Sequence, residues 1–197
     1  MRTAAVESVV LLDESGRAVG TMAKSDVHHR DTPLHLAFSC YVFDAEGRVL
    51  VTRRALDKPT FPGVWTNSCC GHPAPGEEIR DAVRRRVGEE LGLVLADLRL
   101  LLPRFRYRAV MDDGVTENEM CPVFVARTTD LVRADPDEVD DVGWEPWSAF
   151  RSGVLDGTLP VSSWCREQVQ ELPVDPLGAA EAAYDGLPPA AAGLPPG

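Results

Sequence analysis

One stretch of the chain, residues 71–92, constrains the fold more than any other feature. Gly71 opens it, Gly92 closes it, and apolar residues between them recur at the spacing of an α-helix. Those apolar residues are Ile79, Ala82, Val83, Val87 and Leu91. A stripe of this kind lies on one face of a helix, and a glycine directly after it is a common stop signal. The spacing predicts one amphipathic helix over residues 77–91.

Strand-like segments lie on both sides of this helix. Two hairpins are predicted before it, because short apolar runs flank turn-like sequences at 13–16 and 44–47. The expected strands are 6–12 with a partner ending at Met22, 35–43, 49–53, 104–110 and 117–126. Short helices are expected near 146–152 and 163–171. This order indicates an α+β fold with mixed β-sheets packed between helices, an α/β/α sandwich.

The length of the chain fits one domain. Its 197 residues suit a single core, and 44% apolar with 26% charged residues is ordinary globular usage. We expect a domain over 1–170 and a disordered Pro/Ala/Gly-rich tail over 171–197, which has few large apolar residues to bury. The net charge of −11 disfavours nucleic acid and anionic membranes as partners. A small anionic substrate would therefore need local cations or bound metal ions.

The cysteines indicate a reduced environment rather than a disulfide framework. A chain of this length does not need disulfide bonds, and five cysteines leave at least one thiol unpaired. The first residues do not resemble a secretory signal, and no run of 18 apolar residues occurs. We expect a soluble, cytoplasmic protein that acts as a monomer.

The predicted helix and the loop before it carry the first candidate site. From Gly71 to Gly92 the residues follow the spacing G-x5-E-x7-R-x3-E-E-x-G, which resembles the Nudix box. That module holds divalent metal against a diphosphate, and its carboxylates are hard ligands suited to Mg²⁺. The alternative is a solvated helix face with Arg–Glu pairs four residues apart. Arg86 stands where the usual box has a glutamate central to hydrolysis, which argues against a hydrolase.

A second group of candidate ligands combines histidines with carboxylates. The chain has only four histidines, which are His28, His29, His35 and His72. Each histidine alone is more often a structural side chain than a ligand. Glu117 and Glu119 are two residues apart on a predicted strand, so both carboxylates lie on one face. Imidazole with carboxylate ligands suits Mn²⁺, Zn²⁺ or Fe²⁺, so two metals of different character are implied.

Five segments resemble the type I isopentenyl-diphosphate isomerase family, a group of Nudix-fold enzymes of isoprenoid synthesis. They run in order within residues 9–164 and are HLAFS (35–39), LVTRRA (50–55), FPGVWTNSCCGHP (61–73), FRYRA (105–109) and ENEMCPVF (117–124). The resemblance implies a Nudix fold and the interconversion of isopentenyl diphosphate and dimethylallyl diphosphate. It also implies Mg²⁺ with the substrate diphosphate and Mn²⁺ or Zn²⁺ in a His/Glu site.

The resemblance also assigns residues by position. The implied ligands of the His/Glu site are His28, His35, His72, Glu117 and Glu119, while Glu90 would hold Mg²⁺. His28 rather than His29 fits the register, because it lies seven residues before His35. The implied catalytic residues are Cys70, Glu119, Tyr107 and Trp164. The implied diphosphate-binding residues are Lys24, Arg54, Lys58 and Arg86.

The reaction implied by the resemblance needs one proton added and another removed, through a tertiary carbocation-like state. In the family's pattern Cys70 and Glu119 exchange these protons on opposite faces of the substrate. Tyr107 resembles the hydroxyl that hydrogen-bonds near the acid, and Trp164 resembles the residue whose π-face stabilises the cation. A place in the core is the alternative for Trp164, and a solvated helix position is the alternative for Arg86. Cys69 is unmatched, and we expect a buried side chain there.

Two other functions stay open at the level of sequence. A Nudix diphosphate hydrolase is the alternative enzyme, because of the box between Gly71 and Gly92. A metal-dependent diphosphate-binding or regulatory protein without turnover ranks last, because the implied metal cluster exceeds what binding alone needs.

Overall fold

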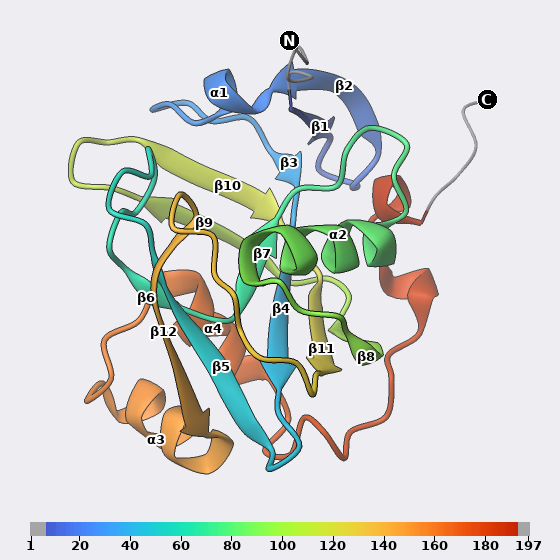
Figure 1. Cartoon of the computed structure of the whole chain (residues 1–197). Helices are drawn as coiled ribbons and strands as arrows, with labels where there is room; N and C mark the ends of the chain where they lie inside the picture. Colours follow the sequence, from blue (N-terminus) through green and yellow to red (C-terminus); the bar gives the residue numbers. More distant parts are fainter. Residues whose placement is uncertain (1–6, 193–197) are drawn as a thin grey trace, which may run out of the picture.

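The structure is a computed structural model that describes residues 7–192 (Figure 1). One β-sheet has the strand order β2-β1-β3-β10-β9, formed by β1 Ser8–Leu12, β2 Ala18–Ala23, β3 His35–Leu36, β9 Arg106–Val110 and β10 Thr116–Met120. The second sheet has the order β12-β5-β4-β11-β8, formed by β4 Phe38–Phe43, β5 Arg48–Arg54, β8 Ala96–Leu102, β11 Val123–Arg127 and β12 Val139–Pro146. The short strands β6 and β7 pair with β5 and β4, at Trp65–Thr66 and Cys69–Gly71.

Helices cover both faces of the second sheet. Successive residues of β4 point to opposite faces, so this strand contributes to two apolar clusters. On one face α2 (Ile79–Leu91) packs its apolar stripe against the sheet, and on the other lie α3 (Trp147–Asp156) and α4 (Ser163–Glu171). Figure 1 shows α2 in front of the sheet and α4 behind it. The predicted α/β/α sandwich is confirmed.

Both ends of α2 are capped, and Gly92 acts as the expected stop signal. The carboxylate of Glu78 accepts hydrogen bonds from the backbone N–H groups of Arg80 and Asp81, which caps the first turn. Gly92 adopts φ 67°, and its N–H donates to the carbonyl of Gly88. This left-handed conformation favours glycine and ends the helix.

The two sheets are joined by two parallel chain segments that pass from one sheet to the other. β3 and β10 pair in the first sheet, with Glu119 opposite His35, and their continuations β4 and β11 pair in the second. The predicted single strand 117–126 is therefore divided at Cys121–Pro122. Proline has no N–H to donate, so a strand is easily interrupted there. The ends of β3 and β10 in the first sheet therefore lie beside the starts of β4 and β11 in the second sheet.

The sequence leads us to expect a disordered tail over 171–197, and the described part of this segment packs against the domain. Over the described part of 171–197 it contains η1 (Tyr184–Gly186) and η2 (Pro189–Ala191), and Leu187 and Ala191 are buried in the core cluster. The N–H of Ala182 donates to the carbonyl of Leu100 at 2.8 Å. A few apolar side chains and backbone hydrogen bonds to β8 are thus enough to fix this segment. Residues 193–197 lie outside the described residues.

The elements that were not predicted are α1 (Lys24–Val27), the strands β6, β7, β8 and β12, and the short helices η1 and η2. α1 has only four residues, and β12 is an edge strand whose sequence VDDVGWEP lacks apolar alternation. The first strand begins at Ser8, and the expected start at Val6 lies outside the described residues. Among residues 7–192, no helix is both long enough and apolar enough to cross a membrane.

Candidate active site

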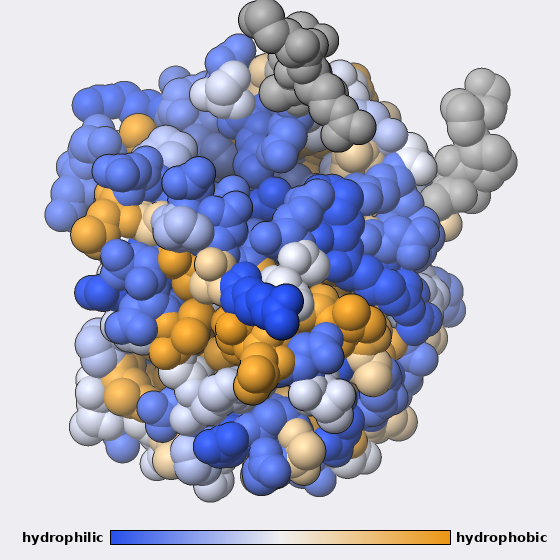
Figure 2. Space-filling view, in the orientation of Figure 1, coloured by the Kyte–Doolittle hydropathy of each residue, from blue (hydrophilic) through white to orange (hydrophobic). Residues whose placement is uncertain are grey.

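A pocket of about 160 Å³ lies where strands of both sheets meet. Its wall includes residues of β5, β7, β9, β10, α2 and α4. Every site residue expected from the sequence lines this pocket except His35, which is fully buried beside it. Figure 2 shows that the face carrying α2 is largely hydrophilic, with a hydrophobic band across its middle. The fold therefore gathers residues from most of the chain into one site.

Three histidines and one carboxylate converge on one side of the pocket. His28, His35, His72 and Glu119 each offer one ligand atom, and these four atoms lie within 4.8 Å of one another. An oxygen of Glu119 is 3.0 Å from Nε2 of His72 and 3.3 Å from Nε2 of His35. Burial lowers the pKa of His28 to about 4, so its imidazole is neutral at pH 7.

This group fits a divalent metal. Nε2 of His28 is buried and has no hydrogen-bond partner among residues 7–192. A buried polar atom without a partner is costly, and a neutral imidazole nitrogen is a good ligand for Zn²⁺ or Mn²⁺. The carboxylate of Glu119 completes a donor set of three nitrogens and one oxygen.

Glu117 lies apart from these four ligand atoms. The Tyr107 hydroxyl is 2.8 Å from an oxygen of Glu117 and 2.8 Å from an oxygen of Glu119, so it bridges the two carboxyl groups. Burial, with the nearby charge of Glu119, raises the pKa of Glu117. Burial also opposes ionisation of Glu119, but His35 and His72 outweigh it and hold the pKa of Glu119 well below its usual range. Glu119 therefore ionises more readily than Glu117.

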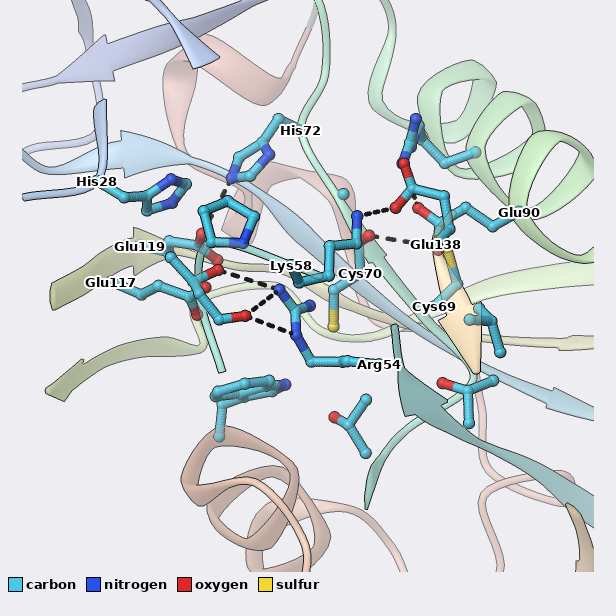
Figure 3. Close-up of a pocket in the computed structure, with 18 of the residues that line it drawn as sticks. His28, Arg54, Lys58, Cys69, Cys70, His72, Glu90, Glu117, Glu119 and Glu138 are labelled. Atoms are coloured by element: carbon cyan, nitrogen blue, oxygen red, sulfur yellow. Dashed lines mark hydrogen bonds and ion pairs between the residues drawn. The ribbon is translucent and has the colours of Figure 1, made fainter. Parts of the chain in front are cut away.

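Cys70 and Cys69 lie next to each other on β7 and differ in environment. Cys70 is half-buried and lines the pocket opposite Ser39 of β4 (Figure 3). Burial raises the pKa of Cys70 to about 12, so at neutral pH it is a thiol that carries a proton. Cys69 is 2% exposed and belongs to the core cluster with α2. Cys69 also lines the pocket.

Cationic side chains cross the middle of the pocket. Arg54 donates from Nε and a terminal nitrogen to the carbonyl of Thr60, at 3.2 and 2.9 Å, and its guanidinium carbon is 5.9 Å from the centre of the Trp164 ring. Lys58 forms an ion pair with Glu138, and burial lowers the pKa of Lys58 to about 8. Lys24 lines the same pocket.

A second acidic group lies on the other side of these cations. Figure 3 shows Glu90 and Glu138 on the side opposite His28 and Glu119, with Lys58 and Arg54 between the two groups. Arg86 forms an ion pair with Glu90, and a nitrogen of Arg86 is 3.4 Å from an oxygen of Glu138. The two carboxylates supply the hard oxygen ligands that Mg²⁺ prefers, so these residues fit that ion.

Arg86 and Trp164 are both buried and both line the pocket. Arg86 is only 6% exposed and lines the pocket, so it does not lie on a solvated helix face. Trp164 is 1% exposed and belongs to the core, yet its ring also lines the pocket. The ring centroid is 5.5 Å from that of Tyr107 and 5.1 Å from that of Phe61. An aromatic wall thus faces the side of the pocket that carries Glu117 and Glu119.

Several residues of the site were missed from the sequence. Thr60 orients Arg54, and Glu138 pairs with Lys58, yet neither was given a role. Glu138 lies in the acidic run DPDEVDD (135–141), where one carboxylate cannot be distinguished from solvated neighbours. Ser39 and Asn67 contact the sulfur of Cys70, and both stand inside recognised segments without an assigned role.

Comparison with known proteins defines the class first. A NUDIX domain family model matches residues 33–164. The solved structure of DR0079 from Deinococcus radiodurans has a TM-score of 0.64 at 18% identity, covering 83% of this chain and 98% of that one. The structure of a MutT protein from Methanosarcina mazei has a TM-score of 0.55 at 19% identity, covering 71% of this chain and 93% of that one. These likenesses show the fold alone, and with the family match they define a NUDIX-domain protein.

Curated relatives then give the particular family. The isopentenyl-diphosphate Delta-isomerase of Saccharopolyspora erythraea is 57% identical over 185 residues, which is 94% of each chain. The isopentenyl-diphosphate Delta-isomerase of Mycolicibacterium vanbaalenii is 57% identical over 177 residues, covering 90% of this chain and 97% of that one. The chain belongs to the isopentenyl-diphosphate Delta-isomerase family, as its motifs predicted.

Proposed function

We propose that this protein interconverts isopentenyl diphosphate and dimethylallyl diphosphate. The observation that carries this proposal is the presence, in one pocket, of a protonated thiol at Cys70 and an ionised carboxylate at Glu119. Moving a double bond requires one group that gives a proton and another that takes one. The relatives named above carry this activity in their name.

The roles of the other lining residues follow from the same pocket. Tyr107 donates a hydrogen bond toward Glu119 and keeps its carboxylate in place for proton exchange. Trp164 offers a π-face that stabilises a developing carbocation and helps to exclude water, which would otherwise add to it. Arg54 lies against the same ring. A substrate whose diphosphate is bound by Arg54 would therefore have its alkene close to Trp164.

Two metals complete the proposed site. His28, His35, His72 and Glu119 would hold Mn²⁺ or Zn²⁺, with Glu117 entering the ligand set through a change of its side chain, and the ion would adjust the proton affinity of Glu119. Glu90 would hold Mg²⁺, which supplies charge neutralisation to the substrate diphosphate. These positions lie on opposite sides of the cationic residues.

The cations provide the grip for the diphosphate. Lys24, Arg54, Lys58 and Arg86 all line the pocket, and they offset the net charge of −11 that repels an anionic substrate. Arg86 occupies the box position that is expected to be a glutamate in a hydrolase, and it lines the pocket beside Glu90. Phosphate binding without hydrolysis follows from this arrangement.

The direct test is product analysis with the full chain. Protein supplied with Mg²⁺ and either Mn²⁺ or Zn²⁺ is incubated with isopentenyl diphosphate, and products are separated and followed by ³¹P NMR. We expect dimethylallyl diphosphate with both phosphates retained, and a loss of at least about 100-fold in kcat for Cys70→Ala. Cys40→Ala removes a buried thiol that does not line the pocket and should retain activity. Release of inorganic phosphate with the alkene unchanged would instead indicate a hydrolase.

A further inference from the structure

A set of buried polar side chains lies behind Cys70. Ser39, Asn67, Gln168 and Tyr41 are each 0% exposed, and none of them lines the pocket. The sulfur of Cys70 is 3.2 Å from Oδ1 of Asn67 and 3.3 Å from Oγ of Ser39. Buried polar groups are costly unless they are hydrogen-bonded, so the direction of each hydrogen bond in this set matters.

The directions are determined by Asn67. Its Nδ2 donates to the backbone carbonyls of Cys40 and Cys69, at 3.1 and 2.9 Å. A carbonyl only accepts, so this contact fixes which end of the Asn67 amide is nitrogen and leaves Oδ1 facing Cys70. Oδ1 cannot donate, so the thiol of Cys70 donates its proton to Asn67.

The remaining directions follow from that first hydrogen bond. Because the proton of Cys70 is directed at Asn67, the contact with Ser39 requires Ser39 to donate to the sulfur. Nε2 of Gln168 donates to Oγ of Ser39 at 2.9 Å, and the hydroxyl of Tyr41 donates to Oε1 of Gln168 at 2.9 Å. The Ser39 hydroxyl therefore accepts from Gln168 and has its own proton available for a sulfur, either that of Cys70 or that of Cys121, also at 3.3 Å.

We propose that Ser39, oriented by Gln168 and Tyr41, is a positioning residue that holds the Cys70 sulfur at the pocket wall throughout the proton exchange. Asn67 can hold the sulfur only while the thiol has a proton to donate. Ser39 can donate to the sulfur after that proton has moved to the substrate, when the sulfur has become an acceptor only. This proposal rests on the proposed function, and it assigns a role that the pocket-lining residues do not supply.

The test compares two buried serines, Ser39 on β4 and Ser68 directly before β7. Ser39→Ala removes the donor to Cys70, whereas Ser68→Ala removes a serine that is 1% exposed and bonds only to the backbone of Val42 and Leu50. We expect Ser39→Ala to lower kcat about 10- to 100-fold, since the deprotonated sulfur of Cys70 loses a hydrogen bond. KM should be unchanged, because Ser39 does not line the pocket that binds substrate. Ser68→Ala should leave kcat within about twofold, although it lowers stability.

A double-mutant cycle separates a positioning effect from general damage to the core. Gln168→Leu should also lower kcat, and the double variant Ser39→Ala/Gln168→Leu should be no slower than Ser39→Ala, because Gln168 acts through Ser39. Thermal unfolding of each variant confirms that the folded protein is assayed. An unchanged kcat in Ser39→Ala, an equal loss in Ser68→Ala, or additive losses in the double variant would each overturn the proposal. Absence of isomerisation by the unaltered protein would overturn the proposed function instead.

Discussion

Lys58 illustrates how the pocket changes the chemistry of a single residue. Its ammonium group pairs with Glu138 and lies near the carboxylate of Glu90, but burial and the neighbouring cations Arg54 and Arg86 lower the pKa of Lys58 to about 8. The charge that should attract a diphosphate is therefore lost only slightly above neutral pH. Arginine at this position would stay charged across the same range.

This residue gives a pH dependence that can be measured. Lys58 is protonated below its pKa of about 8 and neutral above it, so affinity for the anionic substrate should fall as the pH rises through 8. We expect KM to rise about tenfold between pH 7 and pH 9.5, with a smaller change in kcat, because a bound diphosphate favours the protonated form. In Lys58→Arg this part of the rise should disappear. Equal KM profiles for the two proteins would contradict the assignment.

At the scale of elements, the contact between β7 and α2 fixes the part of the pocket where we propose that the diphosphate binds. A Cβ at Gly71 would lie 2.9 Å from Cζ of Phe38 and 3.0 Å from Cγ of Arg86. Both distances are shorter than side chains accept without movement. Glycine at 71 is thus required by close packing, because it leaves room for the side chains of Phe38 and Arg86.

Gly71→Ala should consequently affect both stability and substrate binding. We expect a loss of about 1–3 kcal/mol in the free energy of unfolding from overpacking, and a higher KM because Arg86 must move. Gly143→Ala is a matched control, since its Cβ would meet nothing closer than Cγ2 of Val51 at 3.5 Å. Urea unfolding and steady-state kinetics measure both effects. A similar free energy of unfolding and a similar KM for the two variants would contradict a role of the close contact at Gly71 in stability and binding.

The elements that the sequence could predict are those with strong local signals. The helix over 77–91 has a regular apolar stripe and a glycine stop, and the structure places α2 at Ile79–Leu91. The division of 117–126 had a local signal in Pro122, but the edge strand β12 depends on pairing with the distant strand β5, which no local pattern encodes. The same limit applies to the site. Glu138 pairs with Lys58, which is far away in the sequence, and Thr60 contacts Arg54 only because the backbone turns between them.

At the scale of the whole molecule, the segment after α4 fastens distant parts of the chain together. The carbonyls of Leu177 and Ala179 accept hydrogen bonds from Arg99, and the N–H of Ala190 donates to the carbonyl of Gly16 at 3.0 Å. Leu187 fills the core cluster that also contains residues of β1. The segment therefore connects the second sheet to the hairpin that precedes His28 and Lys24.

Removing the apolar contact of this segment should weaken the whole domain. Leu187 is 7% exposed, so we expect Leu187→Ala to lower the free energy of unfolding by about 2–3 kcal/mol. Leu131 is 82% exposed, and Leu131→Ala should change the same quantity by less than about 0.5 kcal/mol. The comparison is made by urea denaturation at one pH and salt concentration. Equal stability of the two variants would mean that the segment does not contribute to the core.

The most direct test of the central claim follows proton exchange during isomerisation. Protein with Mg²⁺ and Mn²⁺ or Zn²⁺ is incubated with isopentenyl diphosphate in D₂O, and the vinyl and methyl signals are followed by ¹H NMR. A proton-giving Cys70 and a proton-taking Glu119 predict dimethylallyl diphosphate that carries solvent deuterium, formed at least about 100-fold more slowly by Cys70→Ala. An unchanged alkene, or turnover by Cys70→Ala at a rate close to that of the unaltered protein, would contradict this account.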